Sequence, residues 1–112
     1  MHNLKELKIW HKAIELSVAV YSATSNFPKE EVYGLTSQIK RSAISIPSNI
    51  SEGAGRNSNK EFIHFLGIAN GSSYELQTQL IISHKLNLIS NDTLQSLLKE
   101  IDENLEEIDR GA

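Results

Sequence analysis

The chain has 112 residues, of which 39% are hydrophobic and 22% are charged, a composition that predicts one globular domain spanning residues 1–112. It contains no cysteine, which excludes a disulfide framework, a thiolate metal site and a cysteine nucleophile. No run of 18 apolar residues occurs and the first residues do not resemble a secretion signal, so we expect a cytoplasmic protein that does not enter a membrane.

The formal net charge of −3 is distributed unevenly along the chain. Residues 1–60 contain eight Lys and Arg against five Asp and Glu, a balance of +3, whereas residues 61–112 contain three against nine, a balance of −6. The first half can therefore face a polyanion, although solvated helix faces explain the same pattern more simply.

A first helix is predicted from a capping box formed by Asn3 and Glu6 to about Ala23, because the SNFP stretch at 25–28 cannot continue it. Two apolar stripes run along this helix, and together they span about half of its circumference, more than the ~100° stripe of an ordinary surface helix. The first stripe is Leu7, Trp10, Ile14, Ser17 and Tyr21, and the second is Ile9, Ala13, Leu16 and Val20.

A second helix is predicted to begin near Leu35 and to end at Gly53 and Gly55. Its apolar positions keep their helical phase on both sides of Pro47, so we expect one helix that bends at this proline. Pro47 cannot donate a hydrogen bond to the carbonyl of Ala43. The nearby polar side chains of Ser45, Ser48 and Asn49 are expected to satisfy or hydrate the backbone groups that this leaves exposed.

A third helix is predicted to open with a capping box at Ser58 and Glu61 and to end near Leu86. Gly67 and Gly71 are four residues apart, which would let another backbone approach closely. Its main apolar seam is Phe62, Leu66, Ala69, Ser73, Leu76 and Leu80, and a second, narrower stripe is Ile63, Tyr74 and Ile81.

A fourth helix is predicted after a turn whose capping oxygens come from Asn91, Asp92 and Thr93. It has one apolar stripe and an acidic outer face. Four helices with short connections predict an all-α fold, an up-down antiparallel four-helix bundle.

The second stripes on the first and third helices exceed what a monomeric bundle needs to bury, and soluble monomers rarely expose so much contiguous apolar surface. We therefore expect a homo-oligomer, with a monomer whose loops cover these stripes as the alternative. The candidate subunit interface is Ile9, Ala13, Leu16, Val20, Ile63, Tyr74 and Ile81.

Polar residues gather on the opposite side of the second helix, where Glu52 and Arg56 are spaced to form an ion pair. An exposed polar face, a hydrogen-bonding surface between subunits, and a contact with a ligand or nucleic acid are three interpretations that the pattern leaves open. The candidate surface for nucleic acid or a partner is Lys40, Arg41, Ser45, Ser48, Asn49, Glu52, Arg56 and Lys60.

The motifs of common enzymes are missing from the sequence. A di-iron bundle needs two Glu-x-x-His motifs, and the chain has one, Glu61 to His64. The GAGR stretch at 53–56 does not match a phosphate-binding loop, and no G-x-S-x-G nucleophile elbow occurs. We therefore expect no catalytic residue, no metal and no cofactor.

Three stretches carry a family resemblance: FPKEEVYGL, QIKRSAISIPSNISEGAGR and EFIHFLGIANGSSYELQTQL. Together they resemble the 23S ribosomal RNA intervening-sequence family of four-helix-bundle proteins, also called S23 ribosomal proteins. The resemblance spans about residues 4–98, and its most specific pattern is R-x-x-x-S-I-P-x-N-I-x-E-G at 41–53.

This family is similar to the accessory variability protein of diversity-generating retroelements, a pentameric barrel that associates with a reverse transcriptase and nucleic acid. The resemblance thus implies a homo-oligomer, with a pentamer as the expected state, and no established catalytic activity. RNA or a reverse-transcriptase-like protein are the partners that it implies. That relative is strongly basic whereas this chain is acidic, so RNA binding here would depend on a local group of cations in residues 1–60.

Overall fold

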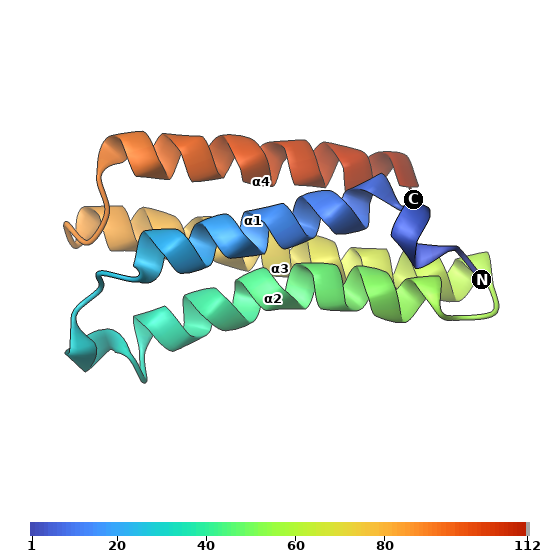
Figure 1. The fold of residues 1–112 in the computed structure, drawn as a ribbon, viewed down its shortest axis with the longest axis horizontal. Coiled ribbons are helices and arrows are strands. Elements are labelled where there is room, and N and C mark those ends of the chain that lie inside the picture. The colour runs from blue at the N-terminus through green and yellow to red at the C-terminus, as the bar shows by residue number, and fades with distance from the viewer. Residues whose placement is uncertain (112) are drawn as a thin grey trace.

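The computed structural model describes residues 1–111, which form helices joined by short connections and contain no strand. Four long helices lie antiparallel to their neighbours in a bundle of about 43 × 25 × 20 Å (Figure 1). The elements in chain order are η1 (Leu4–Glu6), α1 (Lys8–Thr24), η2 (Lys29–Glu31), α2 (Leu35–Ala54), α3 (Asn59–Lys85) and α4 (Asn91–Gly111).

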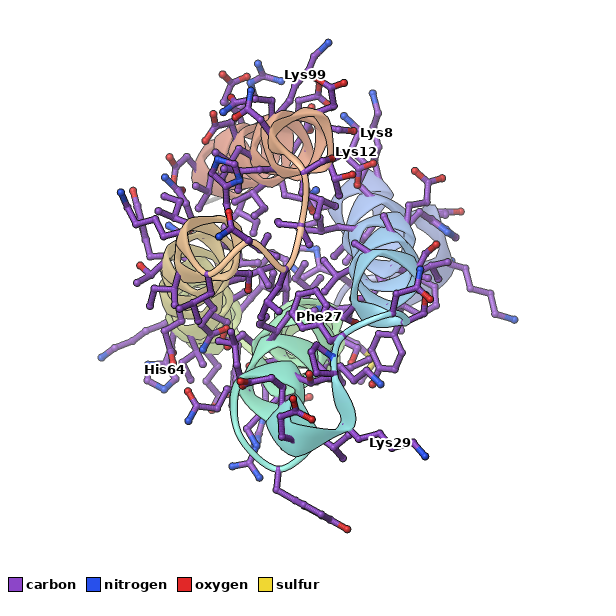
Figure 2. The ribbon with its side chains drawn as sticks, turned by 90° about the vertical axis from the view of Figure 1, so that its left-hand side faces the viewer. Lys8, Lys12, Phe27, Lys29, His64 and Lys99 are labelled. Atoms are coloured by element: carbon purple, nitrogen blue, oxygen red, sulfur yellow. The ribbon has the colours of Figure 1, made fainter. Side chains whose placement is uncertain are left out.

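The four helices stand at the corners of a square when the bundle is viewed along its axis (Figure 2). Helix α1 packs against α2 and α4, and α3 packs against the same two helices from the other side. The apolar stripes of all four meet along the axis, where their burial supplies the main favourable free energy of folding. The predicted all-α four-helix bundle is therefore confirmed.

The stripe of α1 that faces the core is the one that was expected to contact a second subunit. Ala13, Leu16 and Val20 are completely buried, and Ile9 is nearly so. They point between α2 and α4, the two neighbours of α1, and they belong to the core of the single bundle. Their assignment to a subunit interface is corrected accordingly.

The start of the first helix also differs from the prediction. Residues 4–6 form a 3-10 turn, the Asn3 side chain makes no capping hydrogen bond, and α1 begins at Lys8 after an extended Leu7. The N-terminal residues cross the end of the bundle instead. The backbone N–H of His2 donates to the carbonyl of Ala54 over 3.0 Å, and its ring stacks on Phe62 with 4.1 Å between centroids.

The caps of the later helices agree better with expectation. The Ser58 side chain accepts a hydrogen bond from the Glu61 backbone N–H over 3.2 Å, as its capping box predicts. Helix α4 is capped one residue earlier than expected, because the Ser90 hydroxyl accepts from the backbone N–H of Thr93.

Helix α2 runs without interruption through Pro47, which is buried within it. The carbonyl of Ala43, which loses its usual backbone partner to the proline, lies 3.0 Å from the hydroxyl of Ser17 on α1. The same hydroxyl lies 2.9 Å from the Ala13 carbonyl in its own helix, so its single hydrogen is shared between the two acceptors. A neighbouring helix therefore supplies a donor where α2 lacks one, and the bend at Pro47 stays a prediction.

Helices α2 and α3 approach one another closely at Gly53. A Cβ atom at this position would lie 2.8 Å from the Cβ of Phe65 and 3.2 Å from the carbonyl oxygen of Phe62, closer than packed atoms tolerate. The close approach predicted at Gly67 and Gly71 is wrong for the single bundle, because a Cβ added at either would meet open space. Both glycines lie on the outer face of α3.

Candidate functional site

Ser45 and Asn49, two members of the predicted polar surface, are hydrogen-bonded on the side of α2 near α3. The Ser45 hydroxyl lies 2.7 Å from the hydroxyl of Ser72 on α3. The Asn49 amide donates to both the carbonyl and the hydroxyl of Ser45, over 2.8 and 2.9 Å. Ser45 therefore links α2 to α3, while Asn49 bonds to Ser45 from within α2, and both are only partly accessible to a partner.

The end of α2 carries the predicted ion pair. The Arg56 guanidinium lies 2.6 Å from the Glu52 carboxylate, which confirms the pair, and it also sits over the Phe65 ring at 4.9 Å from the centroid. The positive charge of Arg56 is thus shared with a carboxylate and an aromatic face before any partner arrives.

A polar cleft of about 390 Å³ lies further along the α2–α3 groove. Ser42 is only 6% exposed, and the Oε1 atom of Gln79 is buried with no hydrogen-bond partner in residues 1–111. Within the same part of the chain, neither Arg41 nor Glu75 forms an ion pair. The cleft thus offers a guanidinium, a carboxylate and amides to a polar group of a partner. Its lining is Ser37, Gln38, Arg41, Ser42, Glu75 and Gln79.

The remaining candidate residues do not join Arg41 in one surface. The Lys40 ammonium lies 4.8 Å from the centroid of the Tyr21 ring, which places it on the α1 side of α2. Ser48 is exposed on the outer side of α2, and Lys60 is exposed at the start of α3. The structure therefore divides the eight predicted residues between two grooves, an exposed ridge and a helix end.

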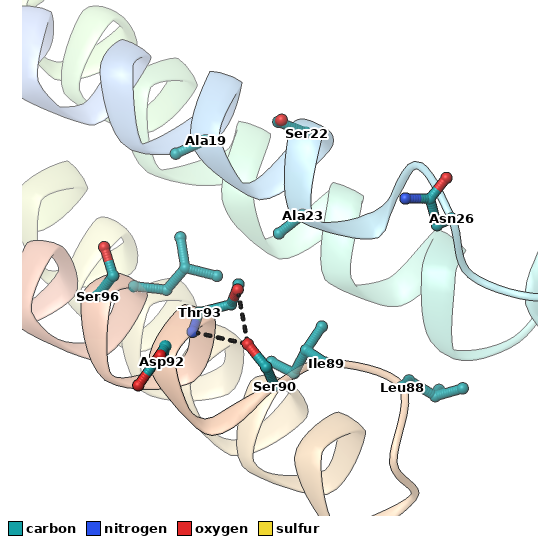
Figure 3. A pocket seen from close by; sticks show the side chains of 11 residues that line it. Ala19, Ser22, Ala23, Asn26, Leu88, Ile89, Ser90, Asp92, Thr93 and Ser96 are labelled. Atoms are coloured by element: carbon teal, nitrogen blue, oxygen red, sulfur yellow. Dashed lines mark hydrogen bonds between the residues drawn. The ribbon is translucent and has the colours of Figure 1, made fainter.

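Figure 3 shows a second hollow that the sequence did not indicate, of about 640 Å³, between the end of α1 and the start of α4. Its α1 wall consists of the small residues Ala19, Ser22 and Ala23. This run of small residues is the one sequence pattern that could have indicated a hollow here. Asp92 is its one charged lining residue, and the Ser90 and Thr93 hydroxyls are bonded to one another over 3.0 Å. The lining of the hollow therefore carries a single formal negative charge.

The carboxyl group of Glu100 on α4 has a perturbed pKa. Burial raises the pKa of the Glu100 carboxyl above its ordinary value, and the neighbouring carboxylates of Glu15 and Glu103 raise it further. Within residues 1–111, no group of three or more His, Asp or Glu side chains is arranged to hold a metal ion. His64, of the single Glu-x-x-His motif, is exposed and lies beside Phe65.

No helix in the described part of the chain is both long enough and apolar enough to cross a membrane.

A solved structure of another protein has a similar fold. A crystal structure of a protein of unknown function from the S23 ribosomal protein family, from Bacteroides thetaiotaomicron, superimposes with a TM-score of 0.80. The two chains are 24% identical, and the match covers 89% of this chain and 94% of that one. No functionally curated protein matches the chain. The description of that structure names no enzymatic activity, and neither does the description of the family whose model matches this chain.

The family model that matches is described as the 23S rRNA-intervening sequence protein, and it spans residues 5–110. The match covers the four long helices except for the last residue of α4, and it includes the α2 segment with Pro47. The chain therefore belongs to the 23S rRNA-intervening sequence protein family.

Proposed function

We propose that this protein is a non-enzymatic scaffold or adaptor that works in the cytoplasm as a homo-oligomer, with a pentamer as the expected state. The observation that carries the proposal is apolar surface left uncovered by the folded bundle. Val18 on α1 is 65% exposed and Tyr74 on α3 is 61% exposed. Exposed apolar neighbours accompany each of them: Ile14 and Tyr21 on α1, and Ile63 and Ile68 on α3.

The revised packing of α1 changes which residues would contact another subunit. With Ile9, Ala13, Leu16 and Val20 in the core, the outer face of α1 is represented by Val18 and its neighbours. On α3, Ile63 and Tyr74 are exposed as an interface requires, while Ile81 is half-buried against the core. Apolar groups in such numbers on a small bundle are typical of surfaces that bind protein.

Sedimentation velocity at micromolar concentration tests this proposal. The native chain is expected to sediment as an oligomer, and Val18→Glu is expected to shift it toward the monomer, because a charge would be buried in the interface. Ser96→Glu, which puts the same charge on an exposed position of α4, serves as the control and should leave the oligomer intact. A native chain that sediments only as a monomer would refute the proposal.

Direct RNA binding is the second candidate function, and the exposed Arg41 beside the α2–α3 cleft is the observation that favours it. Lys12 is a weaker candidate, since its ammonium lies 3.8 Å from the Glu107 carboxylate of α4. Phosphate contacts make RNA affinity depend on salt, so binding to a structured RNA should weaken as salt rises.

Fluorescence anisotropy with a labelled RNA hairpin measures this dependence. Arg41→Ala is expected to reduce the salt slope by about 1. Arg56→Ala should have a smaller effect because Arg56 is already paired with Glu52. Lys99→Ala, on the acidic face of α4, is the control. Binding that is absent or insensitive to salt would remove this second function.

A further inference from the structure

Exposed apolar residues lie along the groove between α1 and α2, together with a cation. Ile14, Val18 and Tyr21 follow one another at helical spacing on the outer side of α1, and Ile44 is exposed on α2. Lys40 joins the two helices through its contact with the Tyr21 ring, 4.8 Å from the centroid. These five residues are called the α1–α2 face, and their formal charge is positive.

A comparable surface lies along the groove between α3 and α4, with the opposite charge. The Asn70 amide of α3 donates to the Asp109 carboxylate of α4 over 3.1 Å, which aligns the two antiparallel helices. Tyr74 follows Asn70 by four residues, and Asp102 precedes Asp109 by seven, so Tyr74 and Asp102 lie on the same side of this groove. The α3–α4 face is defined as Ile63, Tyr74, Ile81, Asp102 and Asp109.

The negative charge of the α3–α4 face is available to a partner. Asp109 is bonded to a neutral amide, and Asp102 forms no ion pair within residues 1–111. Glu106 lies nearby on α4, but its carboxylate is 3.9 Å from the Arg110 guanidinium, which offsets its charge. The two aspartates therefore give this apolar surface a net negative edge.

The two faces lie on opposite sides of the molecule. In the view along the bundle axis, α1 and α2 occupy the right and lower corners, whereas α3 and α4 occupy the left and upper corners (Figure 2). The packing order agrees with this view, because each face spans one pair of neighbouring helices and shares no helix with the other face. One bundle therefore presents both surfaces at the same time.

We propose that the α1–α2 face of one copy of this protein binds the α3–α4 face of a second copy. This inference rests on the proposed homo-oligomer and specifies how its subunits meet. Pairing unlike faces places Lys40 near Asp102 and Asp109 and covers Tyr21, Ile44 and Tyr74. Pairing like faces would bring the same charges together, which is unfavourable when they are desolvated.

An interface of this kind is heterologous, because each subunit uses two different surfaces. A bound pair retains one free face on each member, so further copies add until the rotation between subunits closes a ring. A two-fold symmetric dimer, in contrast, uses one surface twice and stops at two subunits. Blocking one face therefore has different effects in the two arrangements. In a heterologous assembly each subunit keeps its other face for binding, whereas a two-fold dimer that has lost its one surface cannot form.

Two variants, each with one face blocked, test the pairing. Ile44→Glu places a negative charge on the α1–α2 face, and Tyr74→Glu places one on the α3–α4 face, so each variant would bury an added charge in an apolar contact. The two blocked faces carry like charges and therefore repel one another in a mixture. Both native side chains are exposed, so both variants are expected to fold, and circular dichroism with thermal unfolding checks this. Ser96→Glu, outside both faces, is the matched control.

Each variant alone is expected to sediment as a monomer at the concentration where the native chain is an oligomer. Mixed in equal amounts, the two are expected to form a one-to-one dimer and nothing larger, because each contributes one intact face and the blocked faces stop growth. Native mass spectrometry of a mixture with one variant isotopically labelled identifies that dimer.

The outcomes separate this inference from the proposed function. A native chain that is only monomeric overturns both. A native oligomer that survives either variant, or two monomeric variants that do not associate when mixed, overturns the pairing of unlike faces and leaves the homo-oligomer standing.

Discussion

Pro47 and Ser17 act on the same backbone carbonyl, that of Ala43, although they belong to different helices. The proline removes the backbone N–H that would bind the Ala43 carbonyl, and the Ser17 hydroxyl lies 3.0 Å from that oxygen. Ser17 is buried, so water has little access to the carbonyl if the hydroxyl is removed. A buried acceptor without a partner costs about 1–3 kcal/mol.

Ser17→Ala is therefore expected to lower the free energy of unfolding by about 1–2 kcal/mol, measured by urea denaturation. The loss should be smaller in a Pro47→Ala background, because an alanine at 47 has an N–H that can bind Ala43 directly. Thr78→Ala removes an exposed hydroxyl bonded to its own helix and should cost little. Equal losses with and without the proline would contradict the coupling.

Glu100 gives a residue-level prediction about pH. Because its pKa is higher in the folded than in the unfolded chain, the folded state binds the proton more tightly, and the free energy of unfolding falls as pH rises through that range. Glu100→Gln removes this charge beside Glu15 and Glu103. It should therefore stabilise the protein at neutral pH, by less than about 1 kcal/mol because solvent screens a partly exposed group.

Urea denaturation at a series of pH values measures the Glu100→Gln effect. The stabilisation should disappear toward acidic pH, where native Glu100 is itself protonated. Glu30→Gln, an exposed position outside the α1–α4 contact, is the control. A gain that stays constant down to acidic pH would show that the charge of Glu100 is not its cause.

At the scale of the helices, the close contact between α2 and α3 depends on Gly53. A methyl group there would meet Phe65 at 2.8 Å and the Phe62 carbonyl at 3.2 Å, so the helices would have to separate. Gly53→Ala is therefore expected to destabilise the bundle by about 1–3 kcal/mol, despite the better helix propensity of alanine.

Gly67→Ala is the matched control for this substitution. A methyl group at 67 meets no atom within 4 Å, so alanine is expected to be neutral or to stabilise α3 by up to about 1 kcal/mol. Thermal unfolding of the two variants should move in opposite directions or differ clearly in size. A Gly53→Ala variant as stable as the native chain would refute the close contact.

Periodicity predicted where most of these helices lie, because apolar residues at helical spacing have to face a common core. It could not decide which stripe of α1 faces that core. Leu16 and Ile14 are equally apolar in the sequence, and the choice between them depends on where α2 and α4 stand. The Asn3 cap failed for a similar reason, since the contacts of His2 with Ala54 and Phe62 draw the N-terminus across the bundle.

The candidate surface was predicted only in part, because one helix face borders two grooves. Glu52 and Arg56 are local neighbours, and their pair could be read from spacing alone. Gln79 and Glu75 complete the cleft beside Arg41 from another helix, which no local pattern in α2 could reveal. Spacing predicts contacts within a helix, whereas contacts between helices depend on their relative rotation.

The whole molecule has two ends with different surroundings. The chain enters and leaves the bundle at one end, near the α2–α3 turn, because it contains an even number of antiparallel helices (Figure 1). The α1–α2 connection, the α3–α4 turn and the 640 Å³ hollow lie at the other end.

Because both termini lie at one end of the bundle, the same four helices can be connected in a different order. A short linker from Gly111 to Met1, with new ends opened in the turn at 86–90, would give the order α4, α1, α2, α3 and keep every helix pair in contact. Such a circular permutant would carry its own termini at the hollow end. The same protein could then be attached to a surface or a label by either end of its long axis.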